Sequence, residues 1–336
     1  MGRRAWTWGR RFGVALVLVA LVRTVGMGPF VDGVRGLGPR TLLAAAVIGA
    51  GITICSAWRW RVVAAALGVG LPLWAATAAC YRSQFLNSAL PGGVLGDVHR
   101  GLRHGTDAGD LGRGLRAVAW ERTAGQVVQV VLAVGVLLAL PSPLRAAMPA
   151  VVAAGGGAVL AGLVAGRLLA RHGPARLSQS LRAVGGEVRE ALLHPGTWPA
   201  VVLASLVVCA GLLGVFLLAA RSVGVDDGPV QLLPLALIVL LAAGLPLNIA
   251  GWGPREGVAA WVFAAAGLGA GPGAAVATAF GVLVLVAALP GAVLLLAGWL
   301  RPSRAGPERE PVGQAHELVH ELVHSAARKE DGVRHG

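Results

Sequence analysis

The feature that most constrains this sequence is a series of long apolar runs separated by short basic segments. The 336 residues are 56% hydrophobic and 13% charged, with a mean hydropathy of +0.71. Soluble domains carry about 25% charged residues, so one aqueous core could not bury this much apolar surface. We therefore expect an all-α polytopic membrane protein, built from runs at residues 12–31, 41–57, 62–90, 120–140, 149–166, 197–220, 231–249, 258–270 and 273–299.

Two stretches of this pattern are interrupted by helix breakers. Broken backbone is tolerated at membrane depth only where it is buried in protein or lines a watery cavity. We therefore expect six full spans and two opposed re-entrant hairpins, at residues 62–95 and 231–270. Eight plain spans are the alternative. The breakers are Pro72, Pro91, Gly92 and Gly93 in the first stretch, and Pro234, Pro246, Gly251, Gly253 and Pro254 in the second.

The distribution of arginine predicts the orientation. The net charge is +13 and Lys329 is the only lysine. Short loops rich in arginine stay in the cytoplasm, facing anionic headgroups, so this charge does not indicate nucleic-acid binding. We expect cytoplasmic residues 1–11, a transmembrane domain at 12–300 and a mostly disordered cytoplasmic tail at 301–336. Arg59 and Arg61 are assigned to a cytoplasmic loop. The preference for Arg, Ala, Gly and Val is typical of a GC-rich bacterial genome, which suggests the plasma membrane.

The tail contains a pattern that is typical of zinc proteases. His-Glu-x-x-His occurs twice in overlap in residues 316–324, and on a helix it places two imidazoles on one face. Only twelve residues follow His324, too few for a closed site. We expect no catalytic or metal site here, but a short amphipathic helix. Adventitious metal binding by His316, His320 and His324 is the alternative.

The remaining residue counts give no cofactor site. The three cysteines, Cys55, Cys80 and Cys209, are scattered through apolar runs. They are expected to be small buried side chains and not a disulfide or zinc framework. A Gly-x-x-x-x-Gly-Lys-Ser/Thr motif is absent, so no nucleotide cofactor is expected.

The first informative motif is Asn87-Ser-Ala-Leu-Pro-Gly-Gly-Val-Leu-Gly-Asp-Val-His-Arg100, followed by Trp120-Glu-Arg122. Its Pro-Gly-Gly sequence breaks a helix and frees backbone groups for a ligand. Asn87 can both donate and accept hydrogen bonds, and Asp97 and Arg100 are spaced to pair on one helical face. A plain helix–loop–helix turn with interfacial charges is the alternative.

The second motif is Leu245-Pro-Leu-Asn-Ile-Ala-Gly-Trp-Gly-Pro-Arg-Glu256. Arg255 and Glu256 carry the only charges between Val230 and Leu300. Charges at membrane depth are costly and usually functional. An arginine beside a helix N-terminus suits phosphate or carboxylate, although Arg255 could instead snorkel from an external loop. Asn248 precedes this turn as Asn87 precedes the first, which suggests an inverted repeat with a site at its interface.

Together these residues resemble the lysylphosphatidylglycerol synthase transmembrane-region family, also called the flippase-like domain family. The resemblance spans nearly all of residues 12–300. It implies that the membrane part moves a lipid between leaflets. The family's soluble aminoacyl-transferase domain is expected to be missing from this chain, so we expect no synthase activity. The matching residues are Asn87, Leu90, Pro91, Gly96, Asp97, Arg100, Glu121, Arg122, Pro246, Gly253, Arg255 and Glu256.

The sequence therefore predicts a translocator for a lipid with an anionic or zwitterionic headgroup. Expected partners are membrane lipids and, as an option, a separate lipid-modifying or cell-envelope enzyme. A non-transporting protein that docks or regulates such a synthase is the alternative. Expected substrate contacts are Arg255, Glu256, Asn87, Asn248, Gly253, Pro91, Gly92 and Gly93, and the expected cytoplasmic gate is Asp97, Arg100, Glu121 and Arg122.

Overall fold

The computed structural model describes residues 34–90, 93–172, 174–244 and 254–300, and every regular element within these ranges is a helix. The chain divides into two units, residues 1–295 and 296–336. Of the second unit only the end of α12 is described, and all the other helices belong to the first. The helices are α3 (Pro39–Ala66), α4 (Leu73–Ala89), α5 (Leu95–Asp107), α6 (Leu111–Ala139), α7 (Met148–His172), α8 (Ala175–Ala191), α9 (Trp198–Ser222), α10 (Pro229–Ala243), α11 (Pro254–Ala265) and α12 (Ala270–Leu300).

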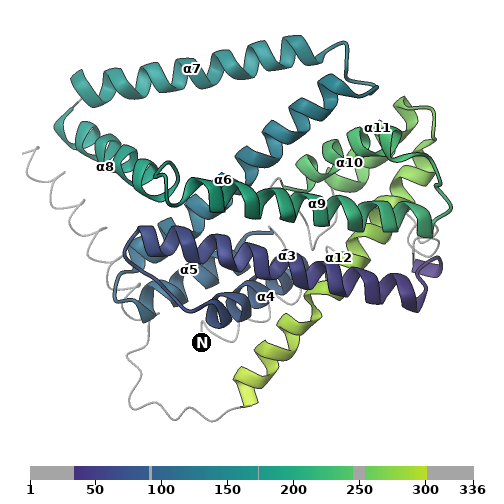
Figure 1. The fold of residues 1–336 in the computed structure, drawn as a ribbon, viewed down its shortest axis with the longest axis horizontal. Coiled ribbons are helices and arrows are strands. Elements are labelled where there is room, and N and C mark those ends of the chain that lie inside the picture. Colours follow the sequence, from purple (N-terminus) through teal and green to yellow (C-terminus); the bar gives the residue numbers. More distant parts are fainter. Residues whose placement is uncertain (1–33, 91–92, 173, 245–253, 301–336) are drawn as a thin grey trace, which may run out of the picture. The chain divides into compact units, whose positions relative to one another are not determined.

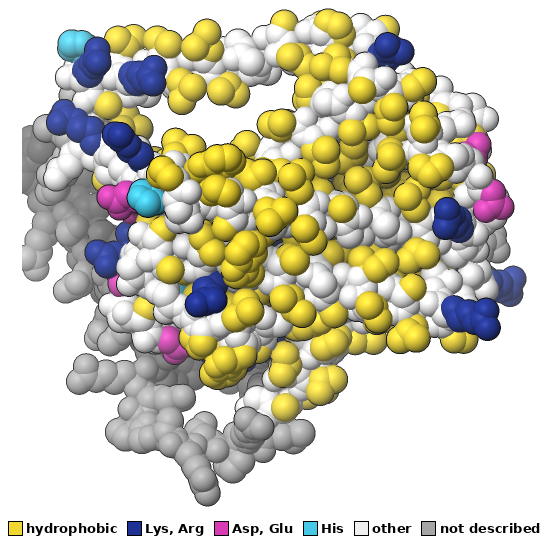
Figure 2. Space-filling view, viewed as in Figure 1, with side chains coloured by type: hydrophobic (Ala, Val, Ile, Leu, Met, Phe, Trp, Pro, Cys, Tyr) yellow, Lys and Arg dark blue, Asp and Glu magenta, His cyan; other side chains and the backbone are white. Residues whose placement is uncertain are grey.

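Five helices, α3, α6, α7, α9 and α12, are long and apolar enough to cross a membrane. They correspond to five of the six predicted full spans. The sixth, at residues 12–31, lies outside the described residues, as does the tail with its His-Glu-x-x-His pattern. The two interrupted stretches contribute the shorter helices α4, α10 and α11, which agrees with the predicted all-α membrane fold. Figure 2 shows hydrophobic side chains over most of the visible face, with Lys and Arg mainly towards its two sides.

Two predicted helix boundaries were wrong. The first interrupted stretch was predicted to begin at residue 62, after a loop at Arg59 and Arg61. Instead, α3 continues through both residues to Ala66. The chain turns only at residues 67–72, where Gly68 has a φ of 75° and Pro72 precedes α4. Pro234 was expected to break a helix, yet it lies inside α10. A proline inside a helix removes one backbone hydrogen bond, but membrane helices tolerate this where neighbouring helices pack around it, and Pro234 is buried.

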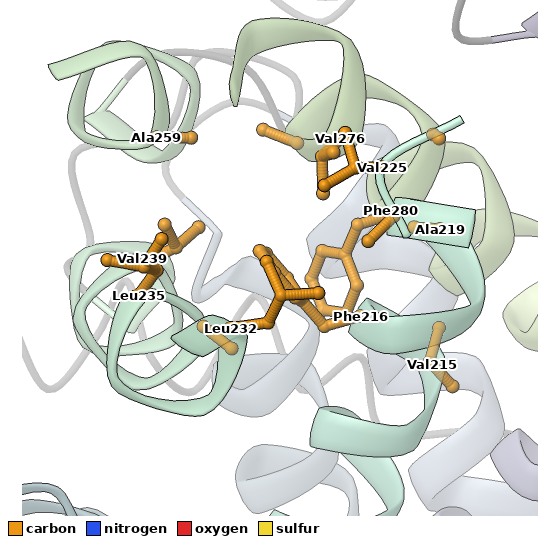
Figure 3. Packing of buried hydrophobic residues seen from close by; sticks show 14 of the residues in the cluster. Val215, Phe216, Ala219, Val225, Leu232, Leu235, Val239, Ala259, Val276 and Phe280 are labelled. Carbon is orange, nitrogen blue, oxygen red and sulfur yellow. The ribbon is translucent and has the colours of Figure 1, made fainter. Parts of the chain in front are cut away.

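The largest hydrophobic core joins α9, α10, α11 and α12 around Phe216, which is fully buried. The Phe216 ring centroid lies 5.8 Å from that of Phe280 and 6.4 Å from that of Phe263. Figure 3 shows these helices converging, with Leu232 and Leu235 of α10 pointing towards the aromatic cluster. This packing fixes α12 beside the start of α11, where Arg255 lies.

Close contacts through glycine position the shorter helices. The helices α5 and α6 form a hairpin (Figure 1) in which Gly105 faces Gly114. A methyl group on Gly114 would lie 2.5 Å from the Gly105 amide nitrogen, well inside van der Waals contact. Small residues that let backbones approach are a common basis of helix packing in membranes. The position of α5 therefore depends on Gly114.

We predict that Gly114→Ala destabilises the protein. Alanine normally favours a helix over glycine, but here the methyl group would push α5 away from α6, at a cost of about 1–3 kcal/mol. Gly135→Ala is the matched control in the same helix, because nothing lies within 4 Å of its added methyl group. Thermal unfolding in mild detergent should show a lower Tm for Gly114→Ala and an unchanged or higher Tm for Gly135→Ala. Equal Tm values would contradict the packing described.

Candidate functional site

A cavity of about 490 Å³ lies among the helices of the first unit and brings the two sequence motifs together. Its walls come from α3, α4, α5, α6, α9, α10, α11 and α12. Seven of the predicted site residues line it: Asn87, Gly93, Asp97, Arg100, Glu121, Arg122 and Arg255. Glu256 contacts Arg255 beside it. The predicted contacts Pro91, Gly92, Asn248 and Gly253 lie outside the described residues.

Glu121 of α6 is the centre of a buried ion-pair cluster in the cavity wall. Its Oε1 accepts hydrogen bonds from Arg59 Nε at 2.9 Å and Nη2 at 2.5 Å, and its Oε2 accepts one from Arg100 Nη2 at 2.9 Å. The three residues are 2%, 7% and 5% exposed respectively. Buried charges persist only when they are paired and hydrogen-bonded. This carboxylate therefore ties α3 and α5 to α6.

Asp97 of α5 extends the same cluster. The predicted pairing with Arg100 is confirmed, with 3.2 Å between Arg100 Nη2 and Asp97 Oδ1. Asp97 also accepts hydrogen bonds from the Ser83 hydroxyl and the Asn87 amide, and it pairs with Arg122. The four predicted gate residues thus form one connected network, Asp97–Arg100–Glu121 with Arg122 on Asp97.

Asn87 uses both ends of its amide, as the sequence suggested. Its Nδ2 donates to Asp97 Oδ2, and its Oδ1 accepts from the Gly96 backbone N–H, each at 2.8 Å. A side chain at Gly96 would collide with the Ser83 carbonyl, so glycine allows this close approach of α5 to α4. Gly93, at a φ of 61°, makes the turn between them. The first motif therefore builds a local turn and also supplies one wall of the cavity.

Arg255 lies on the opposite part of the cavity wall, in the first turn of α11. Its side chain is 10% exposed and pairs with Glu256, with 2.5 Å between Nη2 and Oε1. The guanidinium carbon lies 5.6 Å from the Phe280 ring centroid, a cation–π contact. The guanidinium packs over Gly281, where an added methyl group would lie 3.1 Å from its central carbon. Arg255 is thus buried in the cavity wall and does not snorkel to an external surface.

Several cavity residues were not predicted from the sequence. Arg59 was assigned to a cytoplasmic loop, and that assignment was wrong: it is buried in α3, where Glu121 balances its charge and the Ser205 hydroxyl accepts a hydrogen bond from it. The sequence feature that could have indicated its burial is its position between two apolar runs. Cys80 is buried as expected, but its sulfur also accepts a hydrogen bond from Arg100. Three amide side chains also line the cavity: Gln84, Gln126 and Gln129.

The charges in and beside the cavity favour an anion. The four arginines Arg59, Arg100, Arg122 and Arg255 face three acids, Asp97, Glu121 and Glu256, which leaves one positive charge in excess. Guanidinium and amide groups are suited to phosphate and carboxylate oxygens. Among the described residues, no three His, Cys, Asp or Glu side chains are grouped to hold a metal ion.

We predict that Glu121→Gln strongly destabilises the protein. Removing this carboxylate charge leaves Arg59 and Arg100 buried without their shared partner, which typically costs about 3–5 kcal/mol. Glu190→Gln is the control, since Glu190 is an exposed glutamate of α8. Unfolding in detergent by urea or heat measures the difference. A change as small as that of the control would mean that the cluster contributes little to stability.

Comparison with known proteins places the chain in a family. No curated protein matches it, and no solved structure does. The sequence model described as the lysylphosphatidylglycerol synthase TM region matches residues 10–306, which contain every helix of the described structure and both motifs of the cavity. The chain therefore belongs to the lysylphosphatidylglycerol synthase TM region family.

Proposed function

We propose that this protein is a bacterial plasma-membrane lipid translocator that moves a phospholipid, or another lipid with an anionic or zwitterionic headgroup, between leaflets. The observation that carries the proposal is the shared cavity. Two polar motifs that are distant in sequence line one internal space, and the apolar helices α3, α6, α9 and α12 supply much of its wall. Membership in a lipid-related membrane family supports the same proposal.

The cavity chemistry suggests how a headgroup binds. Arg255 would contact the phosphate, and Glu256 would either hold Arg255 in place or contact an amine of a zwitterionic headgroup. Gln84, Gln126 and Gln129 offer both donors and acceptors to headgroup hydroxyls. Asn248 and Gly253 stay predicted contacts outside the described residues. The acyl chains would remain in the membrane, since a cavity of about 490 Å³ suits a headgroup better than a whole lipid.

The ion-pair network would act as the gate. Arg122 is the least buried of its arginines, with a side chain 47% exposed, whereas the Arg100 side chain is 4% exposed. A headgroup phosphate can compete with Asp97 for Arg122 at a smaller desolvation cost than it can for Arg100. No nucleotide motif is visible in the sequence, so we propose a gradient, the membrane potential or mass action as the driving force.

We predict that Arg255→Ala abolishes most lipid movement. Full-length protein is reconstituted in vesicles of phosphatidylglycerol and phosphatidylcholine that carry a fluorescent phosphatidylglycerol. Dithionite added outside then quenches only label in the outer leaflet, and the assay is run with and without an imposed pH gradient. Wild type should expose inner-leaflet label, and Arg255→Ala should slow this by about tenfold or more, because a charged hydrogen bond contributes about 1.5–3 kcal/mol.

Arg221→Ala is the matched control, since Arg221 is an exposed arginine at the end of α9. Mass spectrometry of co-purified lipids, wild type beside Arg255→Ala, identifies the lipid class that the cavity retains. A protein that only docks a synthase should tolerate Arg255→Ala. Equal lipid movement and equal lipid profiles in both proteins would therefore favour the docking alternative.

Gly281→Ala tests the placement of Arg255 without changing any charge. The added methyl group would displace the guanidinium, which is flexible enough to move without unfolding α12. We expect an unchanged Tm with translocation slowed by about tenfold, as for the loss of one charged hydrogen bond. Gly271→Ala in the same helix has nothing within 4 Å of its methyl group and should behave as wild type. Normal translocation by Gly281→Ala would argue against Arg255 as the contact.

A further inference from the structure

A second, smaller cavity shares Arg100 with the large one. It has a volume of about 270 Å³ and lies between α4, α5 and the turn at residues 70–72. Arg100 and Cys80 belong to the wall of the large cavity, and Arg100 lines this one as well. Besides Arg100 and the buried His104, three basic side chains line it, Arg82, His99 and Arg103, with Asp107 as its one acidic side chain.

Unlike the arginines of the large cavity, Arg82 and Arg103 form no close ion pair among the described residues, and Asp107 only partly offsets their charge. Within the described part of the chain, neither Arg82 nor Arg103 lies within 4 Å of an acidic oxygen, and Arg82 donates only to the Ala78 carbonyl. Burial lowers the pKa of His99, and the nearby charges of Arg103 and then Arg82 lower it further. The three groups line one small pocket, where a bound anion would reduce the repulsion between the guanidinium groups of Arg82 and Arg103.

The floor of this pocket is aromatic and rigid. Trp60 is 1% exposed, the Arg100 guanidinium lies 4.6 Å above its ring, and His104 contacts it edge-on at 5.1 Å. The His104 Nε2 is fixed by the Val69 carbonyl at 2.8 Å. Because the floor is preorganised, an anion in the pocket would need to order only the exposed ends of Arg82 and Arg103.

The exposed side of α5 indicates where the anion comes from. Leu95, Val98 and Leu102 form an exposed apolar stripe, and His99 and Arg103 lie next to it on the helix surface. An amphipathic helix with an apolar stripe beside basic residues is typical of the membrane interface. A lipid headgroup reaching this pocket could leave its acyl chains against that stripe.

We propose that the pocket formed by Arg82, His99 and Arg103 is a second binding site, specific for the phosphate group of an anionic phospholipid at the membrane interface. Two guanidinium groups and an imidazole provide several donors to the oxygens of one phosphate. The volume, slightly below that of common small-ligand pockets, admits a headgroup and not a whole lipid. This site does not require the large cavity to transport anything, so it stands apart from the proposed function.

The test counts lipids bound to the full-length protein by native mass spectrometry. Delipidated protein in a neutral detergent is titrated with phosphatidylglycerol, with phosphatidylcholine as the zwitterionic comparison. The double variant Arg82→Gln/Arg103→Gln is compared with wild type, with Arg82→Lys/Arg103→Lys and with Arg167→Gln/Arg171→Gln. The last pair removes two exposed arginines of α7. Size-exclusion profiles and Tm values show that each variant is folded.

Wild type should bind phosphatidylglycerol at this site more tightly than phosphatidylcholine. The Gln variant should weaken one binding event by about tenfold or more, because it removes two charged contacts. The Lys variant should retain part of the affinity, and the α7 variant all of it. If the Gln variant binds as many phosphatidylglycerol molecules as wild type, with the same affinities, the proposal is overturned. If Arg255→Ala loses a binding event that the Gln variant keeps, that event belongs to the large cavity and does not bear on this site.

A parallel measurement separates lipid phosphate from free phosphate. The Tm of wild type and of the Gln variant is followed during titration with inorganic phosphate, with sodium chloride at equal ionic strength as the comparison. No phosphate-specific stabilisation, together with weakened phosphatidylglycerol binding in the Gln variant, assigns the site to phospholipid. A phosphate-specific rise in Tm that the Gln variant lacks would assign it to free phosphate and overturn the lipid assignment.

Discussion

The fold around the cavity depends on one carboxylate, that of Glu121. It binds Arg59 of α3 and Arg100 of α5 from its own position in α6, and through Arg59 it reaches Ser205 of α9. None of these groups could be buried alone, since an unpaired charge away from water costs several kcal/mol. Bound together, they hold four helices in fixed register. An apolar contact of the same size would leave the helices freer to slide, because lipid tails solvate apolar side chains as well as a neighbouring helix does.

Much of this arrangement could be predicted from local patterns. The apolar runs predicted five long helices that the structure describes, and the spacing of Asp97 and Arg100 predicted their ion pair. The rule that membrane-embedded charges are costly and need a partner correctly selected Arg255, which is buried and paired in the cavity wall. In each of these predictions the informative residues are close together in the sequence. Over such short separations, helix geometry alone fixes the relative positions of the side chains.

Long-range pairings were beyond such patterns. Arg59 and Glu121 are 62 positions apart, and no periodicity connects them. An arginine count over short loops placed Arg59 in the cytoplasm, because the rule takes no account of a charge that finds a distant partner. The same is true of the contact between Gly105 and Gly114, and of Gly281 beneath Arg255. The packing role of a glycine can be identified only when the position of the neighbouring helix is known.

The pairing of Arg255 with Glu256 bears on how a bound headgroup could be released. A fully unpaired buried arginine would bind phosphate so favourably that the headgroup would be released very slowly. Because Arg255 is already paired, a phosphate would exchange one ion pair for another, and its net gain would be smaller than at an unpaired arginine. Sites that conduct or transport need binding that is favourable enough for entry and weak enough for exit. In the proposed translocator, the excess of one positive charge in and beside the cavity would favour anions, and partner exchange at Arg255 would keep their binding reversible.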